Sequence, residues 1–487
     1  NRRTVSSARG QDKMTKEVMM ARGKTRVGIS CGVFGAVAAI GLFGSPSSAA
    51  EGAPAVDDTV PTFSRHIAPI LQRSCQQCHQ PAGIAPMSLL TYRETRPWAR
   101  SIKDRVERRL MPPWHLDTMV GIQDFKNDIS LTAAEIDTVV RWVDAGAPEG
   151  DPADLPPALE FSPADEWELQ AILGRPPDFI VRSTPYRVVA NGQDQWWDPR
   201  LDFEGFETPR YIRGAEFKPS YPLGIKVAHH GHASLRWEDQ AESDDGQSVP
   251  RERRRSVRLI GMGIGKRWDL LPDGVGKLLP EGPAELRFSL HYFPAGEEVT
   301  DVVEVGVWLY PEGEEPRKVT GGEQQFYVDG VHRERLRASD LIIPPHGYLV
   351  LEDQYVMEQP ALIQSFRPHM HMRGTEMSMT ALYPDGRREL LSNVNRYDHN
   401  WQIAYIYDDD AQPLLPRGTV VFLRAKFDNT SANRINPDPD QWVVFGARGA
   451  DEMSHAWIGI TYLEDTEFEE LSAAREAKSQ TDDSDSQ

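Results

Sequence analysis

Two histidines spaced two residues apart, His369 and His371, form one place where this sequence could bind a metal ion. Residues i and i+2 of a β-strand share a face, so both imidazoles can reach the same ion. Met453 lies far downstream, and on a neighbouring strand its thioether would be a third ligand. Two imidazoles and a soft thioether favour copper, because sulfur stabilises Cu(I). The His-x-His pair alone is weak evidence, since such pairs arise by chance; His455 shares the strand face of Met453 and is an alternative ligand.

A second group combines His229, His230 and His291 and would make an all-imidazole site. His229 and His230 are adjacent, and a regular strand would point them to opposite faces. Shared binding by these two residues therefore requires a bulge or a strand end. His230 and His232 would share a face without any distortion. The sequence thus leaves open whether His232 replaces His229 as a ligand.

The segment Cys75-Gln-Gln-Cys78-His79 has the spacing of a covalent attachment site for a c-type haem. His79 would be the proximal ligand of the haem iron. A zinc site or a redox-active cysteine pair is the alternative interpretation. A haem and copper in one chain would together indicate a redox protein.

The other axial ligand of such a haem should be a downstream Met or His, and Met87, Met111, His115 and Met119 are available. Met111 precedes Pro-Pro-Trp, a rigid turn that could hold its thioether over the ring. This block resembles the small cytochrome c domains of secreted bacterial enzymes, in which Met-Pro-Pro-Trp supplies the sixth ligand. That resemblance makes Met111 the predicted ligand, and a buried core methionine is the alternative.

The histidine segments as a set resemble the copper type II, ascorbate-dependent monooxygenases, the family of peptidylglycine α-hydroxylating monooxygenase and dopamine β-monooxygenase. The resemblance covers about residues 176–467. The segments that carry it are His229-His230, His291-Tyr292, His369-x-His371 with Gly374, Tyr397–Gln402, Phe427–Asn429 and Asp451-Glu452-Met453.

The resemblance implies two β-sandwich domains that hold one copper ion each and face one another across a solvent cleft. The ligands implied for the electron-donating copper are His229, His230 and His291. The ligands implied for the oxygen-activating copper are His369, His371 and Met453.

The same resemblance bears on the substrate through Arg367, which stands two residues before the His-x-His pair. The animal peptide enzyme uses an arginine at this place to bind the substrate carboxylate. Its helper residues, an Asn and a Tyr, are replaced here by His455 and Trp457. A peptide ending in glycine is therefore not the expected substrate. Arg367 is a candidate for binding a substrate anion, with pairing to a structural carboxylate as the equal alternative.

Length and charge limit the classes of protein that this chain can represent. At 487 residues it is too long for one hydrophobic core. Its formal net charge of −19 disfavours nucleic acids and anionic membrane surfaces as partners. Residues 1–50 have the character of a signal peptide, with basic residues before the apolar stretch Val27–Phe43 and a cleavage site near Ala50. We therefore expect a periplasmic or secreted protein without stable membrane insertion, an uncleaved anchor being the alternative.

The pattern of apolar residues predicts several domains. Helical spacing and a capping box at Thr132–Glu135 predict a small all-α cytochrome c domain at 51–155, followed by a linker with a short helix at 156–177. Many short β-prone runs predict two all-β, jelly-roll-like copper sandwiches at 178–335 and 336–470, before a disordered tail at 471–487. The runs expected as strands are Phe179–Arg182, Arg187–Val189, Leu286–Tyr292, Val302–Leu309, Tyr348–Leu351, Met377–Leu382, Val420–Phe427 and Trp457–Tyr462. Asp385-Gly386 is expected as a hairpin turn between two of them.

The function expected from these features is hydroxylation of a C–H bond in a small organic substrate by O₂. The cofactors would be two copper ions and one covalently bound haem c, which passes electrons from ascorbate, a quinone or another cytochrome. One alternative is a non-catalytic electron-transfer or copper-binding protein with the same fold. Others are a zinc hydrolase using the same histidines, or a haem domain that serves a separate membrane oxidase.

Overall fold

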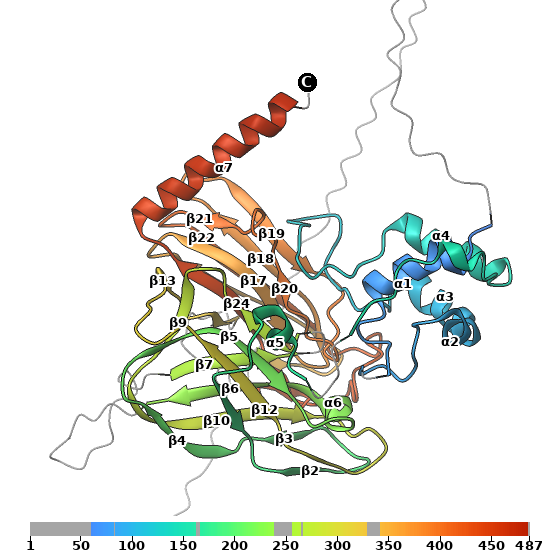
Figure 1. Ribbon diagram of the computed structural model, residues 1–487, viewed down its shortest axis with the longest axis horizontal. Coiled ribbons are helices and arrows are strands. Elements are labelled where there is room, and N and C mark those ends of the chain that lie inside the picture. The colour runs from blue at the N-terminus through green and yellow to red at the C-terminus, as the bar shows by residue number, and fades with distance from the viewer. Residues whose placement is uncertain are drawn as a thin grey trace, which may run out of the picture. The chain divides into compact units, whose positions relative to one another are not determined.

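The computed structural model describes residues 60–81, 83–161, 166–237, 256–263, 266–328 and 341–485 (Figure 1). The expected signal peptide and its cleavage site near Ala50 lie outside the described residues. The predicted join between the two sandwiches, at residues 335 and 336, lies outside them as well. In the described part of the chain, no helix has both the length and the apolar character needed to cross a membrane.

The first described segment is helical. Its elements are the π-helical turn η1 (Phe63–Ile67), α1 (Ala68–Ser74), α2 (Tyr92–Thr95), the 3-10 turn η2 (Arg96–Trp98), α3 (Ala99–Glu107) and α4 (Ala133–Asp144), followed by the turn η3 (Pro152–Asp154). The predicted capping box is present, because the Thr132 hydroxyl accepts from the Glu135 N–H at 3.2 Å while the Glu135 carboxylate accepts from the Thr132 N–H at 2.8 Å. Gly146, with φ of 90°, follows the C-cap residue Ala145 and ends the helix α4. Buried Phe63, Leu71 and Trp142 lie in the small core of this helical unit.

The first β-sandwich follows the helix α5 (Glu168–Leu173), which lies in the predicted linker. One of its sheets has the order β1 (Phe179–Arg182), β12 (Glu304–Leu309), β5 (Arg210–Lys218), β9 (Val275–Leu279) and β13 (Lys318–Val319), with β8 (Trp268–Leu270) on β5. The other has the order β3 (Gln195–Trp197), β10 (Gly282–Tyr292), β6 (Ala228–Arg236) and β7 (Ser256–Met262), with β4 (Arg200–Phe206) on β10. A short pair, β2 (Tyr186–Val188) and β11 (Val299–Asp301), and the helix α6 (Gly224–Val227) complete it.

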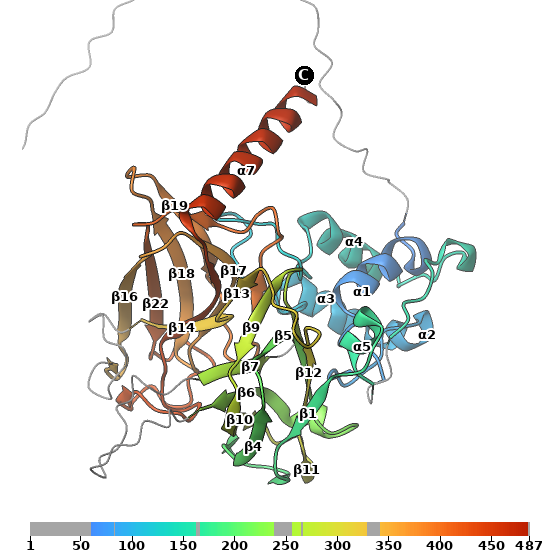
Figure 2. The same ribbon diagram turned by 60° about the vertical axis from the view of Figure 1, so that its left-hand side comes forward.

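The second β-sandwich, orange to red in Figure 1, also has two sheets. One has the order β14 (Glu323–Tyr327), β24 (His455–Tyr462), β17 (Ala361–His369) and β20 (Tyr405–Ile406), with β21 (Leu414–Leu415) on β17. The other, whose strands β16, β22 and β18 are seen side by side in Figure 2, has the order β16 (Tyr348–Val356), β22 (Val420–Asp428), β18 (Gly374–Leu382) and β19 (Arg388–Val394). A short pair joins β15 (Ile342–Ile343) to β23 (Val443–Val444).

Alternation of buried and exposed side chains explains why these segments form sheets. Along β22, Val421, Leu423, Ala425 and Phe427 point into the core, while the residues between them are less buried. The Asp-Gly turn at 385–386 joins β18 to β19 as predicted, with Gly386 at φ of 88°. The prediction of two all-β sandwiches is confirmed.

Two predicted boundaries need correction. Strand β14 pairs with β24, so the second sandwich begins before residue 336, whereas β13 still pairs with β9 of the first. The tail predicted to be disordered at 471–487 contributes to the helix α7 (Asp465–Asp485). The Arg475 guanidinium donates to the Gln412 carbonyl oxygen at 2.7 Å, which attaches α7 to the second sandwich. Polar composition alone did not reveal this contact.

The predicted cytochrome domain at 51–155 is interrupted by a segment that packs elsewhere. Buried Trp114, Leu116 and Phe125 belong to the hydrophobic core of the second sandwich. Leu116 also forms a β-bridge with Val394 of that sandwich. We call residues Arg109–Asn127 the strap.

Candidate metal centres

The strand pair β6–β10 brings the first histidine group together. His230 and His291 are direct partners in the antiparallel ladder, but Tyr292 then pairs with Ala228. His229 is thus the extra residue of a β-bulge, which turns its side chain toward the other two. The bulge that shared binding required is therefore present, and the register explains how adjacent histidines can serve one site.

The three imidazoles converge closely. One ring nitrogen each from His229, His230 and His291 lies within 4.8 Å of the others, and all three residues are buried. The Nδ1 atoms of His229 and His230 are 3.0 Å apart, and those of His230 and His291 are 3.4 Å apart. Imidazole nitrogens bound tetrahedrally at 2.0–2.1 Å to a common ion would be about 3.3 Å apart. This group could hold a metal, and His232 does not belong to it.

Hydrogen bonds on the outer side of the rings fix their tautomers. The Asn400 carbonyl oxygen can only accept, so the His229 Nε2 that it contacts carries the proton. The Nε2 of His291 lies 2.7 Å from the Asp194 carboxylate. This hydrogen bond lowers the pKa of Asp194 to about 2, so the carboxylate accepts. The Nδ1 atoms of His229 and His291 therefore face inward as lone pairs, an arrangement that a bound cation would stabilise.

Burial keeps His229 and His230 uncharged. It lowers the pKa of His229 to about 3 and that of His230 well below its ordinary value, with neighbouring imidazoles adding to the effect. These two rings are therefore neutral near pH 7, the state in which imidazole binds a metal. The ring of Trp196 stacks on His291 at 4.3 Å and helps to hold its plane.

The second histidine group lies where β17 ends beside the start of β24. His369 and His455 are direct ladder partners, and their rings stack at 4.4 Å. His371 and Met453 each lie two residues beyond this pair, outside both strands. The same register continued by two residues would set them opposite one another and put all four side chains on one face of the sheet.

A buried carboxylate ties the two chain ends of this group together. One Glu452 oxygen accepts from the backbone N–H of His371 and, at 3.0 Å, from that of Met453. The other oxygen accepts from the Arg373 N–H at 2.9 Å. Burial raises the pKa of Glu452 to about 7. The Glu452 carboxylate thus brings the backbones of His371 and Met453 close together, and the ring centroids of His369 and His371 are 5.4 Å apart.

Outer hydrogen bonds also orient the rings of this group. The Nδ1 of His369 lies 2.7 Å from the Gln402 side-chain oxygen, and the Nδ1 of His371 lies 3.3 Å from the Asp451 carbonyl oxygen. Both Nδ1 atoms then carry protons, which leaves both Nε2 atoms as lone pairs. Burial lowers the pKa of His371 to about 4 and that of His369 well below its ordinary value.

The two histidine groups adjoin one another. The rings of His230 and His369 meet edge to face with centroids 5.7 Å apart, and both are buried. Asp194 also accepts from the backbone N–H of Gly449 at 3.1 Å and so joins the two sandwiches. The resemblance implied a solvent cleft between two metals, but these two rings are in contact.

The loop Tyr397–Gln402 touches both groups, through the Asn400 carbonyl oxygen on His229 and the Gln402 side chain on His369. His399 of this loop is buried, and burial lowers its pKa to about 4. Its ring centroid is 6.2 Å from that of His229. His399 was not singled out as a ligand from the sequence, because it has no partner at ligand spacing. The resemblance of this segment to the monooxygenases was the one available signal.

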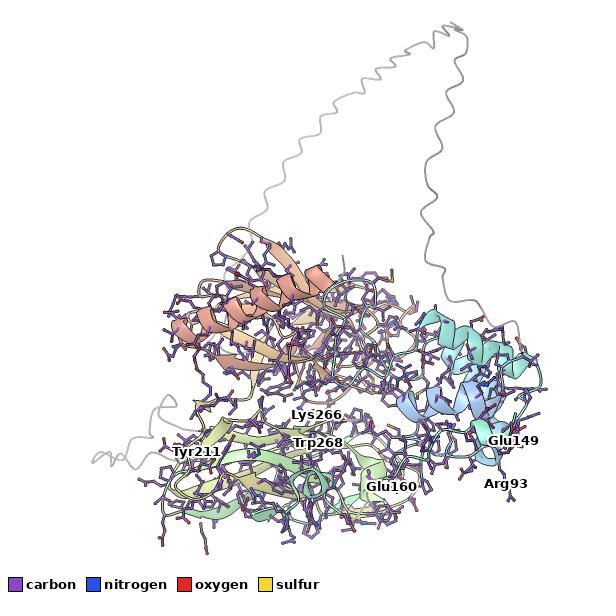
Figure 3. The ribbon with its side chains drawn as sticks, turned by 45° about the horizontal axis from the view of Figure 1, so that its top comes forward. Arg93, Glu149, Glu160, Tyr211, Lys266 and Trp268 are labelled. Atoms are coloured by element: carbon purple, nitrogen blue, oxygen red, sulfur yellow. The ribbon has the colours of Figure 1, made fainter. Side chains whose placement is uncertain are left out.

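Arg367 forms an ion pair rather than presenting a free guanidinium. It donates to Glu323 at 2.7 Å, and Lys266, labelled in Figure 3, lies 3.1 Å from the other oxygen of that carboxylate. Arg258 lies 4.0 Å from Glu323 and 3.6 Å from the centre of the Trp457 ring. Of the two alternatives for Arg367, the structure shows the pairing with a structural carboxylate.

The Cys75–His79 segment follows α1 directly. Both cysteines are free thiols, and burial raises the pKa of Cys75 to about 12. The His79 Nδ1 lies 3.1 Å from the Met87 carbonyl oxygen, which accepts a hydrogen bond from it. The Nε2 of His79 is then left as a lone pair. Gly83 is required here, because a Cβ would come 2.1 Å from the Cys78 carbonyl oxygen. The free thiols and the oriented imidazole fit the donor set of a covalent haem.

Met111 and His115, two candidates for the sixth haem ligand, differ in their surroundings. Met111 is partly buried just after α3, and its N–H donates to the Arg105 carbonyl oxygen at 3.3 Å. His115 is buried between Trp114 and Leu116 in the chain, and both of these neighbours lie in the core of the second sandwich. Met111 stays the predicted ligand.

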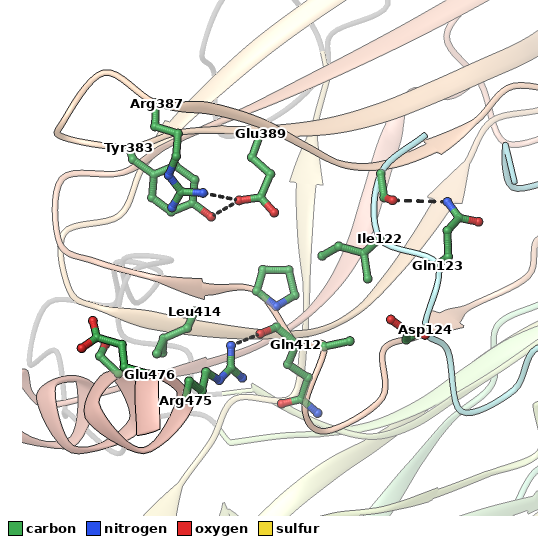
Figure 4. A pocket seen from close by; sticks show the side chains of 14 residues that line it. Ile122, Gln123, Asp124, Tyr383, Arg387, Glu389, Gln412, Leu414, Arg475 and Glu476 are labelled. Atoms are coloured by element: carbon green, nitrogen blue, oxygen red, sulfur yellow. Dashed lines mark hydrogen bonds and ion pairs between the residues drawn. The ribbon is translucent and has the colours of Figure 1, made fainter. Parts of the chain in front are cut away.

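A surface hollow of about 650 Å³ lies away from both histidine groups (Figure 4). The strap, the β18–β19 hairpin and α7 line it. On one side of it Tyr383 and Arg387 both donate to Glu389 at 2.8 Å, and on the other side Arg475 donates to the Gln412 carbonyl oxygen at 2.7 Å. Arg387, Glu389 and Arg475 are hydrogen-bonded within the protein, and no histidine lines the hollow. We assign no site to it.

Comparison with known proteins does not identify the chain. No protein-family model and no curated protein matches it. A putative α-L-fucosidase from Bacteroides ovatus is 8% identical over 69% of this chain and 43% of its own, with a TM-score of 0.14. The tandem CBM22 domain of Paenibacillus barcinonensis Xyn10C is 8% identical over 57% and 86%, with a TM-score of 0.15. A two-domain protein of unknown function from Bacteroides fragilis is 9% identical over 62% and 100%, with a TM-score of 0.14. Likenesses this small leave the functional argument to the site itself.

Proposed function

We propose that this chain is an exported copper monooxygenase that hydroxylates a C–H bond of a small organic substrate with O₂. The first site would hold one copper through His229, His230 and His291. The observation that carries the proposal is the convergence of their Nδ1 atoms in a buried cluster, in which the Nδ1 of His230 lies 3.0 Å from that of His229 and 3.4 Å from that of His291. A bound cation would stabilise ring nitrogens that face one another at these distances.

The second site would hold the other copper through His369, His371 and Met453. Its support is the single Glu452 carboxylate that anchors the backbones of His371 and Met453. A thioether beside two imidazoles favours Cu(I), the state that reacts with O₂. Bound copper supplies the one-electron redox chemistry, and the chain orients the imidazoles through Gln402 and Asp451 and keeps them neutral.

The helical unit would be a cytochrome c domain with haem attached to Cys75 and Cys78 and ligated by His79 and Met111. Ascorbate, a quinone or another cytochrome would reduce it. Haem attachment to this motif takes place outside the cytoplasm, which agrees with the predicted export signal. The substrate is left as a small organic molecule, because Arg367 is paired with Glu323.

A second candidate is an electron-transfer or copper-binding protein without catalysis. It is favoured by the burial of the ligands, since His371 is 2% exposed and His369 6% exposed. A substrate must reach the oxygen-activating copper, and the hollow described above lies elsewhere.

The test begins with the metal content of the full-length protein, produced with haem maturation and purified without chelators. The proposal expects one haem and two copper ions per chain. His291→Ala and His371→Ala should each remove one copper, while His346→Asn, a change at an exposed histidine, should remove none. Zinc at both sites without copper would contradict the proposal and favour a hydrolase.

Oxygen consumption then separates the two copper-based candidates. The reduced copper protein should consume O₂ faster when a mixture of small organic compounds contains a substrate, and His371→Ala should abolish this increase. Full copper occupancy with no O₂ consumption above that of His371→Ala would support the non-catalytic candidate instead.

A further inference from the structure

The strap joins the helical unit to the second sandwich by a series of backbone hydrogen bonds. The N–H of Asp117 donates to the Asn393 carbonyl oxygen at 2.7 Å, and that of Lys126 donates to the Ile406 carbonyl oxygen at 2.8 Å. The Asn127 amide donates to the Ala404 carbonyl oxygen at 2.8 Å. The strap therefore follows two stretches of the second sandwich, one on β19 and one near β20.

Aromatic side chains fix the strap to the sandwich core. Trp114 packs edge-on against Tyr405, with ring centroids 4.8 Å apart. Phe125 stacks on Tyr407 at 5.0 Å. All four residues are buried. The strap is therefore packed against the second sandwich near both of its ends, and it is not a free linker.

One guanidinium holds the segment that contains Met111. Arg396 donates to the Arg109 carbonyl oxygen at 3.3 Å and to the Trp114 carbonyl oxygen at 3.0 Å. Met111 lies between these two acceptors in the chain. The two bonds thus close the Met-Pro-Pro turn against the second sandwich.

Arg396 directly precedes the loop that touches both histidine groups. In this loop the Tyr397 hydroxyl bonds to the backbone of Met370, between His369 and His371, at 2.7 Å and 3.0 Å. The Asn400 carbonyl oxygen accepts from His229. A short run of chain therefore contacts the Met111 segment at one end and both histidine groups beyond it.

We propose that Arg396 is a positioning residue that holds the haem-bearing unit at a fixed distance from both histidine groups. This inference rests on the proposed function for the identity of the haem and copper. Electron transfer would then proceed within a fixed geometry: one electron leaves Fe(II) haem, giving Fe(III), and reduces Cu(II) to Cu(I), with no atom transferred. The haem would be a docked donor and not a mobile one.

The test uses the full-length protein with haem and copper bound. Pulsed electron paramagnetic resonance of the oxidised protein measures the distribution of distances between ferric haem and Cu(II). Arg396→Ala should at least double its width, and Arg396→Lys, which keeps a charged donor, should restore part of the narrow distribution. The matched control is Arg388→Ala, a change at an exposed arginine of β19. An unchanged width in Arg396→Ala would overturn the inference.

Stopped-flow absorbance provides a second readout. Haem reduced with dithionite, and freed of excess reductant, is mixed anaerobically with Cu(II). Arg396→Ala should slow haem reoxidation at least tenfold, while reduction of the copper by added ascorbate keeps its wild-type rate. Equal haem reoxidation rates in the wild type, Arg396→Ala and Arg388→Ala would count against the inference.

Metal-free protein separates failure of this inference from failure of the proposed function. If the wild type binds neither haem nor copper, the proposed function fails, but the positioning role of Arg396 can still be measured. Trypsin should cleave after Arg108 or Arg109 at least fivefold faster in Arg396→Ala than in Arg388→Ala. Equal cleavage rates would overturn it. If Arg396→Ala does not fold, Arg396→Gln, which retains an amide donor, replaces it in each measurement.

Discussion

The two histidine groups are built in different ways. The first is set by one ladder, in which His230 faces His291 and a bulge adds His229. The second gathers residues from strand ends, with His371 and Met453 just beyond the regular pairing of β17 and β24. The first therefore has a geometry imposed by sheet hydrogen bonds, whereas the second depends on the buried Glu452 and on a loop.

Under the proposed function, this difference gives the two groups different roles. Three imidazoles held by a sheet would suit a copper ion that changes oxidation state without changing its ligands. A site at strand ends, with a soft thioether, would leave positions open for a reacting molecule. The edge-to-face contact of His230 and His369 would then place the two copper ions near enough to exchange electrons directly.

The largest expected effect is the loss of one ligand from the rigid group. His291→Ala should lower copper affinity at the first site by more than about 100-fold, because even the outer partners of a ligand contribute 10–100-fold. The second site should keep its affinity. Competition with a chromophoric chelator measures both sites, with His346→Asn as the control. Unchanged affinity at both sites would remove the first group as a metal centre.

A smaller effect is expected from the hydrogen-bond partner of that ligand. Asp194→Asn exchanges a charged acceptor of His291 for a neutral one, and should weaken copper binding at the first site by about 10-fold. The matched control is Asp440→Asn, which alters the exposed His346–Asp440 pair, also 2.7 Å apart. If both variants bind copper equally well, Asp194 does not orient the ligand.

The soft ligand distinguishes the second group from the first. Met453→Leu keeps most of the side-chain volume but removes the sulfur, and should lower Cu(I) affinity at one site by about tenfold, or about 1.4 kcal/mol. Cu(II) affinity should change less. Met379→Leu, at a buried core position of β18, is the control. Equal Cu(I) affinities would place the sulfur outside the site.

The smallest effect concerns His399, which adjoins the first group. Burial lowers the pKa of His399 from 6.5 to about 4. Between pH 6.5 and pH 4, His399 is therefore protonated in the unfolded chain but not in the folded protein. The metal-free protein should lose stability as the pH falls from 6.5 to 4, by about 1.4 kcal/mol per pH unit for each such histidine. Urea titrations should show a shallower loss for His399→Asn. A slope equal to that of the wild type would refute this assignment.

Local sequence patterns predicted much of the fold. The capping box at Thr132 and the Asp-Gly turn before Arg387 were identified correctly, because each depends on a few neighbouring residues. The strap was not predicted, because the apolar residues Trp114 and Phe125 do not show which core they enter. The helix α7 was missed for a related reason, since its contact with Gln412 spans 63 residues of sequence.

The histidine segments and their resemblance to a known family singled out His229, His230 and His291 as a candidate metal group, and the adjacency of His229 and His230 required a bulge for shared binding. Only the tertiary structure decided that His229 and not His232 completes that group, that Arg367 is paired with Glu323, and that the two groups touch. The physical reason is that a side chain's direction follows from local backbone geometry, whereas its neighbours follow from strand register and sheet packing. Those depend on residues far apart in the chain.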